Sequence, residues 1–179
     1  MSVADYRAAL AKADVIHDTA TIQSTIARMA GEIDGELGYE PALFLTVMNG
    51  GMIFAGQLAT RLSAPLEFDY LHATRYRGET SGGELNWLAH PRVSMRDRTV
   101  LLVDDILDEG YTLQAIIEHC RAERAKRVLI AVLCQKVHDR TVPGLRADFV
   151  GIEVPDRYVF GYGMDYHEFG RNLPAIYAL

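Results

Sequence analysis

VLLVDDILDEGYT, residues 100–112, is the stretch of sequence that decides the fold. Val100 to Val103 form an apolar run typical of a strand that is buried on both faces of a sheet. After the stretch, Leu113, Ile116 and Ile117 begin the spacing of an amphipathic helix. We therefore expect the acidic segment to be a strand-to-helix turn, and such turns in open α/β sheets lie at the ligand crevice.

The last part of this stretch suits one compact phosphate. Glu109, Gly110, Tyr111 and Thr112 place backbone N–H groups and one threonine hydroxyl at the start of the expected helix. A loop that bound only polyphosphate would be richer in glycine and would carry a lysine, as a P-loop does, and this stretch contains no lysine. These four residues are therefore expected to bind a single phosphate group.

Three aspartates precede the phosphate-binding residues and suit different chemistry. Asp104 and Asp105 fit hydroxyl donors or a hard cation, such as the two hydroxyls of a ribose with Mg2+ nearby. Asp108 is left to act on a proton. Paired acids after an apolar strand can also cap the following helix or bind a structural cation. The whole stretch instead favours a sugar phosphate whose reacting group lies on the far side of the ribose.

The stretch VLLVDDILDEGYTL resembles the phosphoribosyl pyrophosphate signature of the type I phosphoribosyltransferases, in which an apolar strand is followed by two acids, two apolar residues and D-x-G-x-T. Further segments between residues 40 and 179 resemble the hypoxanthine-guanine members of that family in the same order. The resemblance implies an α/β fold, with a mainly parallel twisted sheet flanked by helices and a small hood built from the N- and C-terminal segments.

The same resemblance implies an enzyme of purine salvage. Such an enzyme transfers the 5-phosphoribosyl group from 5-phosphoribosyl 1-pyrophosphate to a 6-oxopurine, hypoxanthine or guanine, and gives IMP or GMP and pyrophosphate. Mg2+ is the implied cofactor. Members of the family are commonly homodimers or homotetramers, so self-association is implied as well.

The composition is that of an ordinary globular protein. The 179 residues are 49% apolar and 23% charged, which predicts a single domain over residues 1–179. A net charge of −6 shows no general basic footprint, so we expect no nucleic-acid partner. The apolar run Met52 to Leu62 is too short to span a bilayer and no export signal is visible, so we expect no membrane partner and a cytoplasmic location. Cys120 and Cys134 lack metal-ligand spacing and are expected to be core thiols.

Hydrophobic spacing predicts the order of elements. A short helix is expected near Val3 to Ala11, followed by a longer one with an apolar stripe at Ile22, Ile26, Met29, Ile33 and Leu37 that ends at Gly38. Strands are expected at 43–48, 66–72, 99–103, 128–133 and 149–153, with helices at 52–62 and 113–125 between them. This alternation implies a mainly parallel sheet. Irregular structure that folds over the sheet edge is expected after Pro155.

Asn49-Gly50-Gly51 closes one predicted strand and opens an apolar helix. Its backbone amides could bind a second anion, although two glycines before a helix more often form a tight turn. In the family this loop binds pyrophosphate, commonly through a non-proline cis peptide, which in this chain would be Asn49-Gly50. The family usually has lysine or arginine where this chain has Asn49, and that departure removes a cation near the pyrophosphate.

Residues 74–87, TRYRGETSGGELNW, are rich in glycine and small polar residues and are too long for a simple connection. A mobile lid is expected, and a solvated loop without a role is the alternative. The segment matches the flexible loop that closes over the active site in the family, where exclusion of water protects a reactive sugar cation. The resemblance makes Tyr76 the lid residue that contacts the ligand.

Three residues are expected to bind the purine. Lys136 follows an apolar strand and could simply be solvated, but it matches the family lysine that donates to O6 of a 6-oxopurine and so rejects adenine. By resemblance, Tyr158 stacks on the base and Val159 binds the base edge through its backbone. The aromatic spacing around Tyr158 could also be simple packing.

The remaining roles also come from the resemblance. Asp108 acts at purine N7 as base or hydrogen-bond acceptor, and Asp104 and Asp105 hold the ribose diol, directly or through water and metal. Asp165 supports Mg2+, directly or through water, and Arg171 grips pyrophosphate through two hydrogen bonds.

At two further positions the sequence differs from the family pattern, and two alternative functions are considered. Asp104 stands where the family often has glutamate, and Glu109 stands where it often has threonine or serine, so the Glu109 carboxylate must point away from the phosphate. A phosphoribosyltransferase-like regulator that binds nucleotide or RNA without turnover remains open. An enzyme of the same fold that prefers xanthine also remains open.

Overall fold

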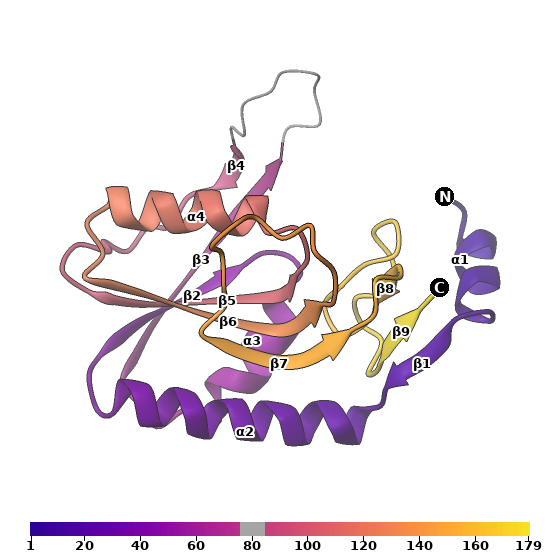
Figure 1. Ribbon diagram of the computed structural model, residues 1–179, viewed down its shortest axis with the longest axis horizontal. Helices are drawn as coiled ribbons and strands as arrows, with labels where there is room; N and C mark the ends of the chain where they lie inside the picture. Colours follow the sequence, from indigo (N-terminus) through magenta and orange to yellow (C-terminus); the bar gives the residue numbers. More distant parts are fainter. Residues whose placement is uncertain (76–84) are drawn as a thin grey trace.

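The computed structural model describes residues 1–75 and 85–179 (Figure 1). Its helices are α1 (Val3–Leu10), α2 (Thr19–Leu37), α3 (Met52–Ala59) and α4 (Tyr111–Ala122). Its strands are β1 (Asp14–His17), β2 (Ala42–Val47), β3 (Leu66–Arg75), β4 (Leu85–Ala89), β5 (Thr99–Leu107), β6 (Arg127–Lys136), β7 (Phe149–Val154), β8 (Val159–Phe160) and β9 (Ile176–Ala178). In this part of the chain no helix is long and apolar enough to cross a membrane.

Six of these strands form the central sheet, in the order β4-β3-β2-β5-β6-β7. Every neighbouring pair is parallel except β3 and β4, which confirms the prediction of a mainly parallel α/β sheet. From β2 the chain moves outward to β3, and from β5 it moves outward to β6 on the other side. The strand order therefore reverses between β2 and β5, and the carboxyl ends of strands at such a switch point are where α/β proteins bind ligands.

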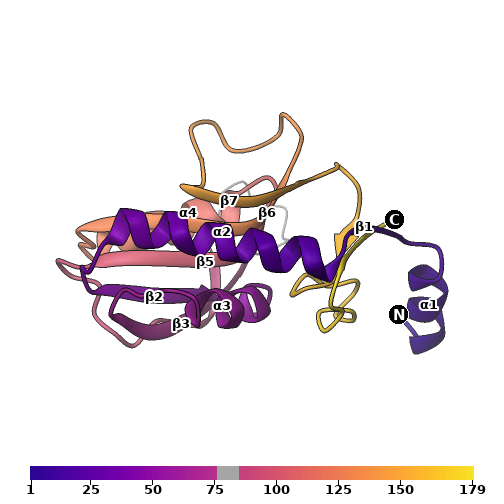
Figure 2. The ribbon, with the colours of Figure 1, turned by 90° about the horizontal axis from the view of Figure 1, so that it is seen from below.

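The sheet has a hydrophobic core on each face because its central strands are buried on both sides. Val100, Leu101, Leu102 and Val103 of β5 are each 0% exposed, as predicted. Successive side chains of a strand point to opposite faces, so Leu101 and Val103 pack with α2 and α3, whereas Val100 and Leu102 pack with α4. In Figure 1 α4 lies above the sheet and α2 below it, and Figure 2 shows α2 running along the lower face.

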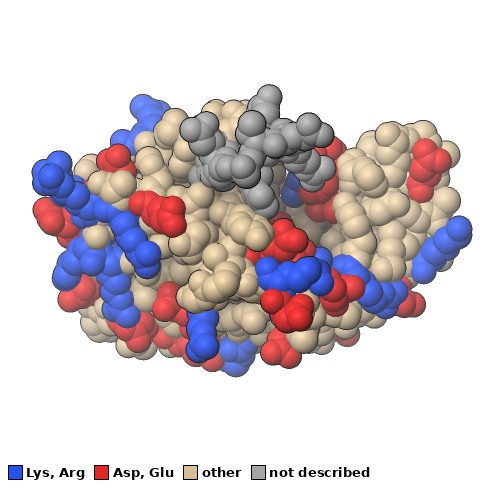
Figure 3. Space-filling model, turned by 45° about the horizontal axis from the view of Figure 1, so that its top comes forward, with Lys and Arg blue, Asp and Glu red and all other residues tan. Residues whose placement is uncertain are grey.

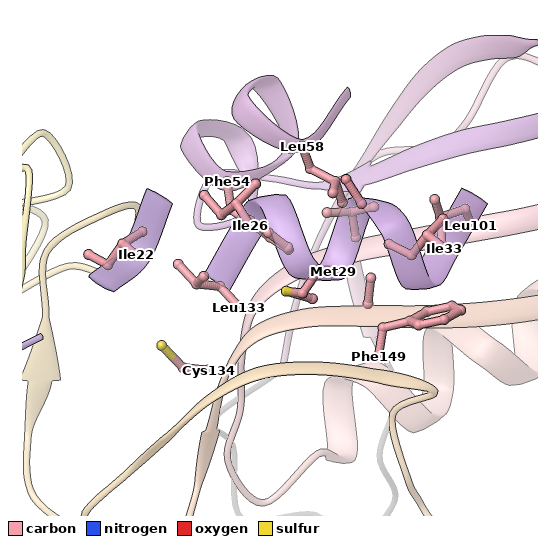
Figure 4. Close-up of a cluster of buried hydrophobic side chains, with 14 of the residues drawn as sticks. Ile22, Ile26, Met29, Ile33, Phe54, Leu58, Leu101, Leu133, Cys134 and Phe149 are labelled. Atoms are coloured by element: carbon pink, nitrogen blue, oxygen red, sulfur yellow. The ribbon is translucent and has the colours of Figure 1, made fainter. Parts of the chain in front are cut away.

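The predicted apolar stripe of α2 is confirmed. Its buried side chains are Ile22, Ile26, Met29, Ala30, Ile33 and Leu37. Figure 4 shows the stripe packing toward Phe54 of α3 and toward Leu101 and Leu133 of the sheet. Burial of each large aliphatic side chain contributes about 1.5–3 kcal/mol. The helix ends at Gly38 as expected, where a φ of 57° suits a residue without a side chain.

A second, smaller sheet brings the two ends of the chain together. Its order is β1-β9-β8, with antiparallel pairs, and it confirms the predicted hood of N- and C-terminal segments. In Figure 1 β6 and β7 point toward this hood. The expectation of irregular structure after Pro155 holds for most of that segment and is wrong at the two short strands β8 and β9. Strands of two and three residues are too short to produce a visible hydrophobic period.

The segment 74–87, which was predicted to be one loop, begins and ends in strands. Thr74 and Arg75 continue β3, and Leu85 to Trp87 begin β4, which pairs antiparallel with β3. The prediction that 74–87 is one loop is therefore wrong at its ends, since cross-strand pairing overrides a composition rich in small polar residues. Tyr76 lies outside the described residues.

Cys120 and Cys134 are unpaired and buried as predicted, and burial raises the pKa of Cys120 to about 11.

Candidate active site

The acidic pair lies inside a strand and not in a turn. β5 pairs with β6 as far as Leu107, which is opposite Gln135, so the ladder of hydrogen bonds continues past Asp104 and Asp105. The prediction of a strand-to-helix turn that includes both acids is therefore wrong, and the turn is confined to residues 108–110. As part of a central strand, the two carboxylates are held at the switch point by backbone pairing.

The N-terminus of α4 forms one wall of the first of three pockets. Gly110 precedes the helix with a φ of 85°, and a Cβ there would overlap the side chain of Leu145. Tyr111 and Thr112 form the first turn of the helix, and a helix N-terminus favours negatively charged groups. The pocket has a volume of about 250 Å³ and is lined by Asp104, Ile106, Asp108, Glu109, Gly110, Tyr111, Thr112 and Leu113. We call it the helix-end pocket.

Asp104 and Asp105 are adjacent carboxylates whose side chains are half-buried at the end of β5. The backbone N–H of Asp105 donates to Asp104 Oδ1 at 2.9 Å. Burial, followed by the charge of Asp105, raises the pKa of Asp104 well above its ordinary value. Burial also raises the pKa of Asp105, although the charge of Arg171 opposes that shift. Such a pair favours partners that bring donors or positive charge.

Asp108 is the centre of a three-residue hydrogen-bonded group. Lys136 Nζ donates to its Oδ2 at 2.6 Å, and His138 Nε2 lies 2.6 Å from its Oδ1. Burial opposes ionisation of Asp108, but the hydrogen bonds from Lys136 and His138 outweigh it and lower the pKa of the carboxyl. Asp108 is therefore a carboxylate at neutral pH.

The second pocket, of about 210 Å³, contains the residues expected to bind a purine. It is lined by Asp105, Ile106, Asp108, Lys136, Tyr158, Val159, Met164 and Asp165, and we call it the aromatic pocket. The side chain of Tyr158 is held edge-on against Tyr166, with ring centroids 5.2 Å apart. Lys136 comes from β6, whereas Tyr158 and Val159 come from the hood, so the pocket exists only where the hood meets the sheet.

The third pocket, of about 360 Å³, lies where the loop after β2 meets β5. It is lined by Met48, Asn49, Gly50, His72, Thr74, Leu88, Asp104, Asp105, Glu168 and Arg171, and we call it the loop pocket. The loop approaches β5 closely, because a Cβ at Gly50 would overlap the Asp105 carboxylate. The cis peptide is Met48-Asn49, so the expectation of a cis Asn49-Gly50 bond is one residue out of place.

Arg171 is anchored by the hood at the wall of the loop pocket. One guanidinium nitrogen donates to the carbonyl oxygen of Gly163 at 2.8 Å, and the other lies 2.7 Å from Asp165 Oδ1. Asp165 Oδ2 accepts a hydrogen bond from the backbone N–H of Glu168 at 2.9 Å. The structure thus pairs Arg171 with Asp165, two residues for which separate roles were predicted.

Two residues of the site were missed by the sequence-based prediction. His138 follows Lys136 by two positions, and alternate residues of an extended chain point the same way, so this spacing could have indicated that both face Asp108. His72 lines the loop pocket from β3. Nothing in the order of residues near His72 connects it with Asn49 or Arg171, since only the sheet order brings β3 beside β2.

The three pockets meet at the three aspartates. Asp104 lines the helix-end and loop pockets, Asp105 lines the aromatic and loop pockets, and Asp108 lines the helix-end and aromatic pockets. Each pair of pockets therefore shares one carboxylate. In Figure 3 acidic and basic side chains lie side by side around the hollow between the body of the molecule and its hood. A helix N-terminus, a half-buried acidic pair and two further pockets at an α/β switch point are together typical of a phosphosugar transferase.

Comparison with known proteins narrows this class to a family. The phosphoribosyl transferase domain family matches residues 12–167. The hypoxanthine-guanine phosphoribosyltransferase of Bacillus subtilis (strain 168) is 35% identical over 156 residues, which cover 87% of this chain and 86% of that protein. The protein is a phosphoribosyltransferase, and it belongs to the hypoxanthine-guanine phosphoribosyltransferase family.

Solved structures agree with this assignment. A hypoxanthine phosphoribosyltransferase from Staphylococcus aureus matches with a TM-score of 0.87 and 29% identity, covering 93% of this chain and 90% of that one. A hypoxanthine phosphoribosyl transferase from Trypanosoma cruzi, studied for the role of its C-terminal region in oligomeric state and activity, matches with a TM-score of 0.86 and 27% identity, covering 93% and 90% of the two chains.

Proposed function

We propose that this protein transfers the 5-phosphoribosyl group of 5-phosphoribosyl 1-pyrophosphate to N9 of a 6-oxopurine, giving IMP or GMP and releasing pyrophosphate. The observation that carries the proposal is the sharing of one aspartate between each pair of pockets. A ribose placed among Asp104, Asp105 and Asp108 would direct its 5-phosphate, its 1-pyrophosphate and the incoming base into three different pockets.

The helix-end and loop pockets each suit one of the two phosphate groups. The 5-phosphate would accept hydrogen bonds from the backbone N–H groups of Glu109 to Thr112 and from the Thr112 hydroxyl. The pyrophosphate would lie against Asn49 and Gly50 and accept hydrogen bonds from Arg171. Between them, Asp104 and Asp105 would accept hydrogen bonds from the ribose hydroxyls.

The aromatic pocket suits the purine. Tyr158 would stack on the ring, and Val159 would bind the base edge through its backbone. Lys136 would leave Asp108 and donate to O6 of the base. An adenine amino group at that position offers only donors to a donor, so adenine would be rejected.

The Lys136–Asp108 pair explains how the proton of the base would be handled. When Lys136 moves to O6, Asp108 Oδ2 becomes able to accept the N–H proton at purine N7. The bond from ribose C1 to pyrophosphate breaks with its electron pair going to the leaving oxygen, and a bond from N9 to C1 forms. The N7 proton passes to Asp108. A lowered pKa keeps Asp108 ionised and ready to accept it.

The residues present fit Mg2+ together with a substrate. Mg2+ is usually held by one or two carboxylates plus substrate phosphates and not by a cage of protein ligands. Asp104, Asp105 and Asp165 supply carboxylates beside the loop and aromatic pockets, and the described residues form no cluster of three or more metal-ligating side chains. When bound, Mg2+ would neutralise charge on the departing pyrophosphate.

The test is to incubate the protein with Mg2+, 5-phosphoribosyl 1-pyrophosphate and each of hypoxanthine, guanine, xanthine, adenine and uracil, while pyrophosphate release is followed. Release with hypoxanthine or guanine, and not with adenine or uracil, is expected. Faster pyrophosphate release with xanthine than with any other base would identify a xanthine-preferring enzyme. No release with any base, together with binding of the donor, would indicate a regulator.

We also propose that the second copy in a homo-oligomer binds at the outer face of α3 and β3. Met52, Phe68 and Tyr70 are 50%, 57% and 50% exposed on this face, around an apolar cavity of about 460 Å³. Sedimentation velocity of the wild type and of Phe68→Glu tests this: the wild type should sediment as a dimer or larger species and the variant as a smaller one. A monomeric wild type, or an unchanged variant, would refute it.

A further inference from the structure

His138 is buried against the carboxylate of Asp108 by a short, well-defined contact. Its side chain is 3% exposed, and its Nε2 lies 2.6 Å from Asp108 Oδ1. Lys136 occupies the other oxygen, Oδ2, at the same distance. The two oxygens of Asp108 therefore have different partners, and only one of these partners, the lysine, has a role in binding the base.

The second ring nitrogen of His138 fixes the protonation of the first. The backbone N–H of Arg140 donates to His138 Nδ1 at 3.1 Å, so Nδ1 is an acceptor and carries no proton. A neutral imidazole has one proton, which then lies on Nε2 and points at Asp108 Oδ1. His138 is therefore a neutral donor in a single tautomer, held in place by the main chain of its own loop.

The same loop is tied to the hood beside the aromatic pocket. The Arg140 guanidinium makes two hydrogen bonds with Asp156, at 2.8 and 2.7 Å. Asp156 lies two residues before Tyr158, which lines the aromatic pocket. The Thr141 hydroxyl also donates to the backbone carbonyl of Asp108, at 3.4 Å. One loop thus holds Asp108 at its main chain and its side chain, and contacts the segment that carries the aromatic wall.

We propose that His138 is a positioning residue that holds Asp108 in the orientation needed to accept the purine proton. When Lys136 leaves Oδ2 for the base, His138 remains on Oδ1 and keeps the carboxylate from rotating, so that Oδ2 stays directed at N7. The inference rests on the proposed function, because it assigns a role in proton transfer. His138 touches neither donor nor base and acts only through Asp108.

Matched amide substitutions test the contact. Gln places its Nε2–H group close to the position of the histidine Nε2, whereas Asn carries the same amide but is too short to reach Asp108. His138→Gln should keep most of kcat, and His138→Asn and His138→Ala should each lower kcat roughly ten- to hundredfold. The KM for 5-phosphoribosyl 1-pyrophosphate should not change, because its phosphates bind in the helix-end and loop pockets. Val137→Ala, at a 57% exposed neighbour, is the control and should keep wild-type kcat.

Two further measurements separate positioning from a general structural role. In an Asp108→Asn background, His138→Ala should have little further effect on the residual kcat, because the group it positions is gone. Long-range 1H–15N NMR of the wild type should show His138 as the Nε2–H tautomer, a result that does not depend on turnover.

The outcomes distinguish this inference from the proposed function. A wild type that is inactive with all five bases refutes the proposed function. The NMR measurement of the His138 tautomer would still test the contact between His138 and Asp108. An active wild type whose kcat is unchanged in His138→Ala refutes the positioning role. Equal losses in Gln and Asn variants, additivity with Asp108→Asn, or an Nδ1–H tautomer would each overturn it as well.

Discussion

Lys136 Nζ lies 2.6 Å from Asp108 Oδ2, so the residue proposed to recognise the base and the residue proposed to take its proton form an ion pair in the free site. A 6-oxopurine satisfies both groups at once, since its O6 accepts from the lysine and its N7–H donates to the carboxylate. A base that offers only one of these groups leaves a charge without a partner. The pair therefore links recognition of the base by Lys136 to the release of Asp108 Oδ2, which can then accept the N7 proton.

Asp108→Asn should lower kcat by roughly two to four orders of magnitude while binding of 5-phosphoribosyl 1-pyrophosphate is retained. The amide cannot accept the N7 proton, but the helix-end and loop pockets keep their other contacts. Steady-state kinetics and calorimetric titration with the donor would measure the two effects. Activity close to that of the wild type would show that Asp108 is not the proton acceptor.

Lys136→Ala should raise the KM for hypoxanthine roughly tenfold or more, the loss expected when a hydrogen bond from a charged donor is removed. It should also reduce the preference for hypoxanthine over adenine, because the donor that rejects an amino group is absent. The comparison is kcat/KM for the two bases in the variant and the wild type. An unchanged ratio would place Lys136 outside base recognition.

Acid unfolding should reveal the contacts of Asp108. The folded pKa of Asp108 is lowered from 3.8, so ionised Asp108 stabilises the fold above that pH, and the contribution is lost as the pH falls through the lowered value. The Tm difference between the wild type and Asp108→Asn should therefore be largest above about pH 5 and shrink below about pH 3.8. A constant difference across that range would contradict the assignment.

Asp104→Asn should stabilise the protein at neutral pH while it impairs activity. Burial and the charge of Asp105 raise the pKa of Asp104, so the folded state holds its proton longer than the unfolded state does, and stability falls as the pH rises through that window. Removing the charge should add about 1–2 kcal/mol at neutral pH without Mg2+. Asp14→Asn, at a side chain that is 67% exposed, is the control and should change Tm little. A lower Tm for Asp104→Asn would contradict the electrostatic cost.

Gly50→Ala should damage the loop pocket. Its Cβ would overlap the Asp105 carboxylate, so either the Asp105 side chain or the loop must shift, and the KM for 5-phosphoribosyl 1-pyrophosphate should rise. Gly31→Ala, in the exposed face of α2, meets nothing within 4 Å and should instead stabilise the fold by about 0.5–1 kcal/mol. Wild-type kinetics in Gly50→Ala would show that the close approach of Gly50 to Asp105 does not affect binding of the donor.

Much of the fold could be predicted because its elements carry regular patterns. The stripe of α2 and the apolar run of β5 are long enough to show a helical period and a two-sided burial. The strands of the hood and the pairing of β3 with β4 were missed, since they depend on partners distant in the chain. β5 was predicted too short because two acids interrupt its apolar run, although backbone pairing with β6 continues past them.

The order of residues alone determined the α/β class and the family, because an apolar strand, two acids and a glycine before a helix form a local pattern that needs no distant partner. Only the tertiary structure decided that each pair of pockets shares an aspartate, that Arg171 pairs with Asp165, and that Lys136 and His138 divide the two oxygens of Asp108. Those relationships join residues from β5, β6, the loops and the hood. Sheet order and hood docking set their distances, and no local spacing encodes them.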